Sequence, residues 1–311
     1  MEYRRVGNSG LSVSTISVGG WLTFGNTVDM DTTREIIREA VDRGVNSVDL
    51  ADVYAKGEAE RFIGQALRDY RRCDLVISSK VFWPVTNSPN GHGLGRKHIM
   101  ESIDQSLKNL GTDYVDLYYC HRSDSEVPIE ETVCAMDDLI HQGKVLYWGT
   151  SMWHPKLMRR VHRFTRRHGL YAPIVEQPEY SLLHRWMEKR VLSTARKLHV
   201  GLMVWGPLAG GILSGKYQNG TPDGSRGSCT TALHKDLTAK TLEKVGKFCK
   251  LAETLALRPA QLAIAWLLQR PEVTSVITGA TSPQQLACNV GAVDIKINPE
   301  VDKQLRALFP I

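Results

Sequence analysis

Short apolar, β-branched segments alternate along the chain with stretches of helical periodicity. The eight apolar segments are Thr15–Val18, Val45–Asp49, Leu75–Ser79, Val115–Cys120, Val145–Thr150, Ile174–Glu176, Leu202–Trp205 and Ser275–Thr278. Between them, amphipathic patterns predict helices, for example over Thr33–Arg43 and Glu131–His141. Continuous apolar strands separated by such helices are typical of parallel strands that are buried on both faces.

Eight strand–helix units favour a closed (β/α)8 TIM barrel of the α/β class, formed by residues 1–311 as a single domain. A doubly wound open sheet is the alternative, but the turn Gly19–Gly25 lacks the G-x-G-x-x-G spacing usual in such sheets. The segment Glu2–Ser14 predicts a β-hairpin that plugs one end of the barrel. We expect further helices over Pro259–Leu268 and Pro299–Leu308.

The connection after the seventh predicted strand is unusually long. From Gly206 to about Thr238 the sequence shows no strong periodicity, and Gly, Ser, Thr, Pro and Asp dominate. A structureless connection of this length in a compact domain is usually functional or disordered. Because it follows a barrel strand, at the end where barrel active sites assemble, we expect it to have a function.

The composition is that of a globular protein and excludes a disordered or fibrous chain, with 42% hydrophobic and 23% charged residues. The formal net charge is +6. One stretch, 159–167, holds five arginines: Arg159, Arg160, Arg163, Arg166 and Arg167. We expect the solvated face of a helix there, with a nucleic-acid or acidic-membrane patch as the alternative. A single aromatic ring that could stack on bases, that of Phe164, interleaves with these arginines, so we predict no nucleic-acid partner.

Neither a signal peptide nor a run of 18 apolar residues is present, which predicts a cytoplasmic protein without a membrane span.

The cysteines are Cys73, Cys120, Cys134, Cys229, Cys249 and Cys288. They form no C-x-x-C pair, and no histidine completes a zinc pattern. We expect free thiols in a reducing compartment and no metal site.

Polar side chains follow three neighbouring predicted strands: Asp49 after the second, Lys80 after the third, and His121 with Arg122 after the fourth. Tyr54 lies five residues beyond Asp49. A lysine ammonium beside a phenol stabilises the phenolate, so we expect the pKa of Tyr54 to fall below about 10. Tyr as acid, Lys and Asp as a pair and His as orienter suit protonation of a carbonyl oxygen. Taken singly, each of these residues can instead be interpreted as part of a structural contact, such as a Lys–Asp ion pair.

The chain resembles the aldo-keto reductases through motifs that occur in the family's order over nearly the whole length. These motifs are Val48–Tyr54, Ser78–Lys80, Tyr118–Arg122, Trp148–Ser151, Glu176–Tyr180 and Val204–Gly211. Within the family it is most similar to the branch of potassium-channel β-subunit-like reductases, through Ile129–Thr132, Ser214–Tyr217 and Gln261–Trp266.

This resemblance implies reduction of an aldehyde or ketone to an alcohol, or the reverse, with hydride from a nicotinamide and a proton from Tyr54. The implied catalytic tetrad is Asp49, Tyr54, Lys80 and His121. The implied cofactor is NADPH, with NADH as the alternative, and the implied partner is a small carbonyl substrate. A cofactor-sensing regulatory or channel-associated protein with weak turnover is the alternative function, and a homo-oligomer is compatible with both.

The resemblance also implies where the cofactor binds. The implied contacts are Gly20, Trp21, Ser151, Met152, Gln177, Trp205, Gly206, Pro207, Leu208, Ala209, Gly210, Lys216, Ser225, Arg226, Gly279, Thr281, Gln285, Cys288 and Asn289. Met152, Gly206 and Cys288 differ from the residues usual in the family, and each removes a side-chain contact. An aromatic substrate mouth is expected from Trp21, Phe24, Trp83 and Trp153, together with His121.

Overall fold

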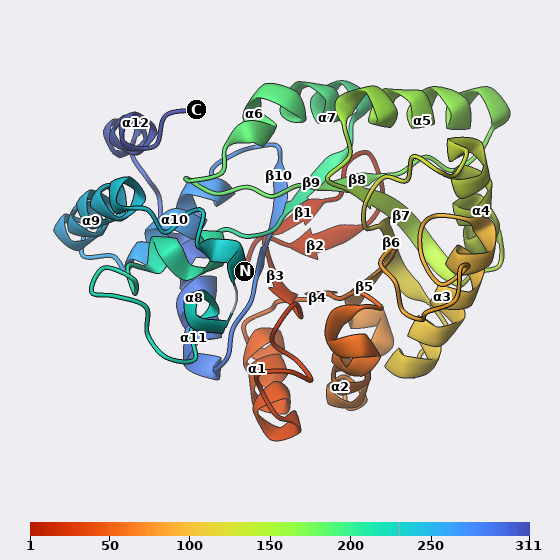
Figure 1. Cartoon of the computed structure of the whole chain (residues 1–311), viewed down its shortest axis with the longest axis horizontal. Coiled ribbons are helices and arrows are strands. Elements are labelled where there is room, and N and C mark those ends of the chain that lie inside the picture. Colours follow the sequence, from red (N-terminus) through yellow and green to blue (C-terminus); the bar gives the residue numbers. More distant parts are fainter. Residues whose placement is uncertain (230) are drawn as a thin grey trace.

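The eight predicted strands form a closed parallel barrel in the order β10-β3-β4-β5-β6-β7-β8-β9 (Figure 1). Their bounds are β3 Ile16–Gly19, β4 Ser47–Asp49, β5 Val76–Val81, β6 Val115–Cys120, β7 Val145–Ser151, β8 Val175–Gln177, β9 Gly201–Val204 and β10 Val273–Thr278. The computed structural model describes residues 1–229 and 231–311. The barrel prediction is confirmed, and closure excludes the open-sheet alternative.

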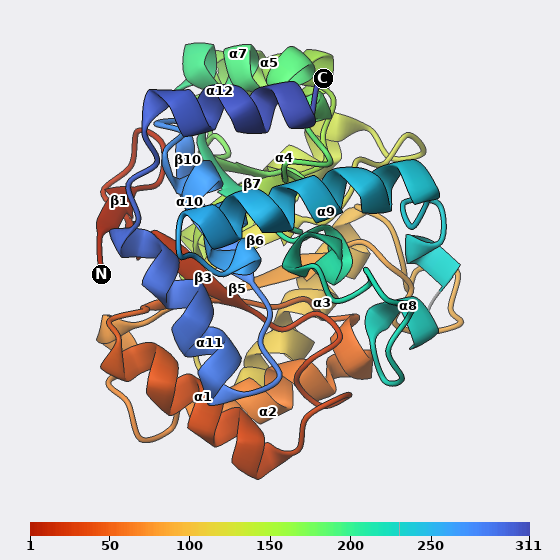
Figure 2. The ribbon, with the colours of Figure 1, turned by 90° about the vertical axis from the view of Figure 1, so that its left-hand side faces the viewer.

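Helices surround the barrel (Figures 1 and 2). The longer ones are α1 Met30–Asp42, α2 Glu58–Ala66, α3 Arg96–Leu110, α4 Ile129–His141, α5 Pro155–His168, α6 Trp186–Arg190, α7 Leu192–Leu198, α9 Ala239–Thr254, α10 Pro259–Leu268, α11 Pro283–Val290 and α12 Pro299–Leu308. Both α10 and α12 have the predicted bounds, because each starts with proline at its first turn. The arginines of α5 are exposed, as expected for a solvated helix face.

An N-terminal hairpin of β1 (Tyr3–Arg5) and β2 (Ser12–Ser14) closes the amino-terminal end of the barrel. Val6 and Val13 are completely buried and pack with inward-facing residues of the strands. Gly7 has φ +56°, and a Cβ atom there would lie 2.6 Å from the carbonyl oxygen of His199. This close approach requires glycine. The hairpin prediction is confirmed.

The long connection after β9 is not structureless, which corrects the sequence-based expectation. It contains short helices at Ala209–Ser214, Arg226–Cys229 and Thr231–Leu233. Left-handed backbone at Gly210 and Gly211 interrupts the first of them, so no amphipathic periodicity develops in the sequence. Thr230 lies outside the described residues, and the thiol of Cys229 outside the described side chains. The other five cysteines are free thiols.

Within the described part of the chain, no single helix is long and apolar enough to cross a membrane. The pair α9 and α10 passes that test only when taken together, with a bend of 88° between the two helices. In the fold, α10 is a core helix: Leu262–Leu268 are all buried.

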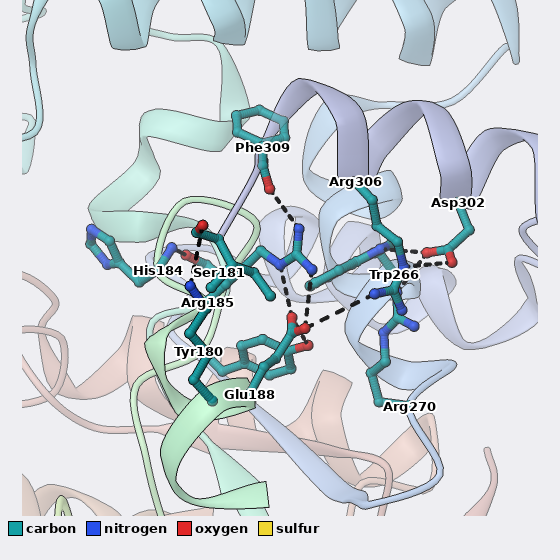
Figure 3. A network of polar contacts seen from close by, with 12 residues as sticks. Tyr180, Ser181, His184, Arg185, Glu188, Trp266, Arg270, Asp302, Arg306 and Phe309 are labelled. Carbon is teal, nitrogen blue, oxygen red and sulfur yellow. Dashed lines mark hydrogen bonds and ion pairs between the residues drawn. The ribbon is translucent and has the colours of Figure 1, made fainter.

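A network of polar contacts joins α6, α10 and α12 (Figure 3). Arg185, whose side chain is 5% exposed, donates to both carboxylate oxygens of Glu188, at 2.8 and 3.0 Å, and to the carbonyl of Phe309. The Tyr180 hydroxyl donates to the same carboxylate at 2.7 Å. The carboxyl-terminal helix is thereby fixed to the segment that follows β8.

Replacing Glu188 by alanine should lower the free energy of unfolding by about 3 kcal/mol, because it leaves the buried Arg185 guanidinium without its counter-charge. Urea unfolding followed by far-UV circular dichroism measures this loss. Glu253→Ala is the matched control, since Glu253 is exposed on α9 and its removal should cost less than about 0.5 kcal/mol. Equal losses in the two variants would contradict the prediction.

Candidate active site

The carboxyl ends of three adjacent strands bring together the polar residues that the sequence singled out. Asp49 ends β4, Lys80 lies near the end of β5, and His121 follows β6. Tyr54 begins a short 3₁₀ turn five residues after Asp49. The Lys80 ammonium donates to Asp49 Oδ2 at 2.6 Å and to Tyr54 Oη at 3.2 Å. The predicted convergence of these side chains at one mouth is confirmed.

The Lys80 side chain has no exposed surface, so its charge must be compensated inside the protein. Its three acceptors are Asp49, Tyr54 and the carbonyl of Leu50, the last at 2.6 Å. Burial works to lower the pKa of Lys80, but the Asp49 carboxylate and Tyr54 act against it. The net shift is upward, and Lys80 therefore remains an ammonium.

The pKa of Tyr54 is raised above 10.0, which corrects the expectation that it falls. Burial of the phenol favours its neutral form, and this effect outweighs the opposing attraction of Lys80. Tyr54 is consequently a neutral hydroxyl that can still donate a proton. Lys80 limits the upward shift and does not reverse it.

Hydrogen bonds from both sides fix the Asp49 carboxylate. Ser78 Oγ and Gln177 Nε2 each donate to Asp49 Oδ1 at 2.9 Å. Sequence reasoning missed Ser78, although it shares a strand face with Lys80 because the two residues are two positions apart on β5. Ser151 Oγ donates to the backbone carbonyl of Gln177 at 2.9 Å, so β7 and β8 also support the site.

His121 lines one side of the Tyr54 phenol, with ring centroids 5.8 Å apart and an interplanar angle of 77°. Burial lowers the pKa of His121 to about 2, so the imidazole is neutral. Among the described residues, its buried Nδ1 has no hydrogen-bond partner. The Trp83 ring lies next in line, 6.2 Å from His121.

Two of the four expected mouth aromatics are at the surface. Trp21 is 46% exposed and Trp83 is 38% exposed. Phe24 and Trp153 are 0% and 1% exposed because both pack into the hydrophobic core. Neither ring therefore contributes exposed surface to the mouth in this structure, and their contact with a substrate stays a prediction.

The loop after β9 and the end of β10 meet beside Trp21. The Arg226 guanidinium lies 5.0 Å from the Trp21 ring centroid, and a Cβ atom on Gly279 would be 3.9 Å from Arg226 Nη2. Ser225 Oγ is buried, without a hydrogen-bond partner among the described residues. A cation and an open hydroxyl donor are groups that a phosphate needs, so this side of the mouth fits a phosphorylated cofactor.

The Ala209–Ser214 turn also presents a cation. Gly210 and Gly211 have φ +68° and +98°, and a Cβ atom on Gly211 would lie 3.0 Å from Lys216 Nζ. Only glycine lets the Lys216 side chain cross the backbone here. Pro207 and Leu208 connect this turn to the end of β9.

The remaining expected cofactor residues lie around the same end of the barrel. Thr281 donates from its amide and its hydroxyl to Gln285 Oε1, at 3.0 and 3.1 Å, and Asn289 Nδ2 donates to the Gly279 carbonyl at 3.4 Å. Cys288 is half-buried beside Asn289.

Four further expected cofactor residues follow the ends of three barrel strands, β3, β7 and β9. Gly20 donates its amide to the Asp49 carbonyl at 2.9 Å. Met152 has φ +60°, and its sulfur accepts from the Glu179 amide at 3.4 Å. Trp205 pairs with Glu179 in an isolated bridge, and Gly206 follows it with φ +70°.

Comparison with known proteins identifies the family. The model of the Aldo/keto reductase family matches residues 15–309. The chain belongs to the aldo/keto reductase family. It is 44% identical to a probable voltage-gated potassium channel subunit beta of Oryza sativa subsp. japonica, over 99% of this chain and 96% of that protein.

Two further relatives carry similar names. A probable voltage-gated potassium channel subunit beta of Arabidopsis thaliana is 45% identical over 95% of this chain and 92% of its own length. A putative voltage-gated potassium channel subunit beta of Schizosaccharomyces pombe is 42% identical over 98% of this chain and 92% of its own length.

The family's general chemistry is NAD(P)H-dependent oxidoreduction of carbonyl compounds. Across the described residues, no three His, Cys, Asp or Glu side chains gather as metal ligands.

Replacing Lys80 by methionine should lower the free energy of unfolding by about 3–5 kcal/mol, because it leaves the Asp49 carboxylate buried without a counter-charge. The double variant Lys80→Met/Asp49→Asn should be more stable than Lys80→Met alone. Urea unfolding measures the free energy of unfolding of both variants. The control is Lys250→Met, which removes an exposed charge from α9. A double variant less stable than Lys80→Met would show that the charge pair does not determine the loss.

Proposed function

We propose that this chain is an NADPH-dependent reductase of aldehydes or ketones, with Tyr54 as the proton donor. The observation that carries the proposal is the contact between Tyr54 Oη and Lys80 Nζ at 3.2 Å, with Lys80 paired in turn to Asp49. In the overall reaction, carbonyl, NADPH and one proton give alcohol and NADP⁺. The reverse reaction uses the same groups.

When bound, the cofactor supplies the hydride for the carbonyl carbon. Tyr54 Oη donates its proton to the carbonyl oxygen, and the Lys80 ammonium stabilises the phenolate that this transfer leaves. Asp49 keeps Lys80 charged and directed at the phenol. The neutral His121 imidazole offers a hydrogen bond that orients the carbonyl oxygen beside Tyr54.

The residues around Trp21 support the choice of NADPH. Ser225 and Arg226 follow β9, and Gly279, Thr281 and Gln285 follow β10, the adjacent strand of the barrel. Arg226 has no carboxylate partner within the described residues, so its charge is free for a phosphate. We infer that the phosphates bind here, and that the nicotinamide lies near Ser151, Gln177 and Trp205.

A panel of aldehydes and ketones tests the proposal. Consumption of NADPH and of NADH is followed at the nicotinamide absorbance band.

Tyr54→Phe should lower kcat by at least about 100-fold while cofactor binding, measured by tryptophan fluorescence, stays the same. Tyr171→Phe is the control, since Tyr171 is 54% exposed and lies outside the site. Full turnover by Tyr54→Phe would remove Tyr54 from the role.

The pH dependence of reduction follows from the two shifted groups. The donor must be protonated, and a pKa of Tyr54 above 10.0 keeps it so throughout the neutral and mildly alkaline range. His121, with its pKa at about 2, contributes no inflection near pH 6.5. We expect kcat/KM for carbonyl reduction to stay level from pH 6 to about pH 10 and to fall above it. A decline centred below pH 9 would contradict the assignment.

The names of the relatives support a second candidate, a cofactor-binding regulatory subunit of a channel. The relatives named as channel subunits are 42–45% identical over nearly the whole chain. The same panel separates the two candidates. Tight NADPH binding without NADPH consumption across the panel would favour the regulatory function.

A further inference from the structure

Arginines that are not fully solvated have carboxylate partners almost everywhere in the described part of this chain. Arg4, Arg72, Arg185 and Arg270 pair with Glu2, Asp116, Glu188 and Asp302. Among the described residues, the two half-buried exceptions are Arg122 and Arg226, and both lie at the mouth of the barrel. A partly desolvated guanidinium without a counter-charge is costly, which suggests that each receives an anion from a ligand.

Arg122 is held in one orientation at this position. Its Nη1 donates to the carbonyl of His121 at 2.5 Å and makes a longer contact of 3.5 Å with Ser151 Oγ. Its guanidinium carbon lies 5.7 Å from the ring centroid of Trp83. Most of its five N–H donors therefore remain unused, and they adjoin the mouth aromatics.

Two carboxylates lie near Arg122, but neither is within ion-pair distance. Glu176 is fully buried, and its oxygens accept from the Thr150 hydroxyl and the Trp153 amide. Glu179 accepts from His184 at 2.7 Å. Burial lowers the pKa of Arg122, and these carboxylates and Tyr54 partly oppose that shift. Among the described residues, Arg122 is therefore a cation without a carboxylate partner.

The position of Arg122 on the barrel separates it from the proposed phosphate side. Arg226 follows β9, whose neighbour in the barrel is β10. Arg122 follows β6, which lies diametrically opposite β10 in the ring of eight strands. Arg122 adjoins His121, and the Tyr54, His121 and Trp83 rings form one continuous wall. Arg122 therefore lies on the side of the mouth that holds Tyr54 and His121, away from the proposed phosphate side.

We propose that Arg122 forms an anion subsite for the substrate, so that the preferred substrates are aldehydes bearing a carboxylate. The inference rests on the proposed reductase function and adds the substrate class to it. The carbonyl group lies at Tyr54, the body of the substrate packs on His121 and Trp83, and the carboxylate pairs with the guanidinium.

Two para-substituted benzaldehydes test this directly, because 4-carboxybenzaldehyde carries a charge and 4-nitrobenzaldehyde is a neutral analogue of similar shape. We expect the wild type to prefer the carboxylate. Arg122→Met should lower kcat/KM for 4-carboxybenzaldehyde by about 10- to 100-fold and change that for 4-nitrobenzaldehyde by less than about threefold. Arg122→Lys should retain part of the preference.

Lys56→Met is the matched control, since it removes an exposed charge of the same sign from the turn that holds Tyr54. Its selectivity between the two aldehydes should equal that of the wild type. Equal losses for both aldehydes in Arg122→Met would overturn the subsite and indicate that Arg122 only positions the catalytic groups. Unchanged kinetics for both would overturn it as well.

A binding measurement tests the subsite independently of turnover. Benzoate, but not neutral benzamide, should quench tryptophan fluorescence in a saturable manner, with Trp83 beside the proposed anion. Arg122→Met should weaken this binding by about tenfold or more. If neither these aldehydes nor any other carbonyl of the panel reacted with either cofactor, the proposed reductase function would fail, while the benzoate titration would still decide the subsite. Equal benzoate affinity of wild type and Arg122→Met would overturn it.

Discussion

A lysine ammonium with no exposed surface dominates the chemistry of the barrel mouth. Burying an uncompensated charge costs several kcal/mol, so the surrounding groups are arranged to stabilise it. Asp49, the carbonyl of Leu50 and Tyr54 surround Lys80 Nζ within 3.2 Å. Asp49 is in turn held by Gln177 from the far side of the barrel. The geometry of the proton donor thus follows from the electrostatic needs of one side chain.

Charge is also distributed unevenly around the mouth. Lys80 is neutralised within the protein, whereas Arg122 and Arg226 have no carboxylate partner in the described structure. Each lies over an exposed tryptophan, Trp83 or Trp21, and the two arginines follow well-separated strands. A ligand with anionic groups at two places would meet a cation at each. The proposed cofactor and the proposed carboxylated substrate together have this distribution of charge.

Much of the fold could be predicted because its signals are local. Buried parallel strands read as continuous apolar segments, and the helix bounds of α10 and α12 follow from proline at the first turn. The connection after β9 could not be predicted, since left-handed Gly210 and Gly211 break the periodicity of its short helices. The burial of aromatic side chains in loops could not be predicted either, because a loop has no periodicity that marks its inward face. Phe24 packs into the core, while Trp21 three residues earlier is exposed.

The sequence by itself determined the closed barrel, the plugging hairpin and the residues that gather at the strand ends, because strand direction and chain order fix which ends meet. It could not determine the direction of the Tyr54 pKa shift. That direction depends on the balance between desolvation and the attraction of Lys80, and only the packed structure sets how deeply the phenol is buried. Nor could it show that Arg122 lacks a carboxylate partner in the described part of the chain. Ion pairing depends on side-chain contacts between distant segments, which exist only once the barrel has closed.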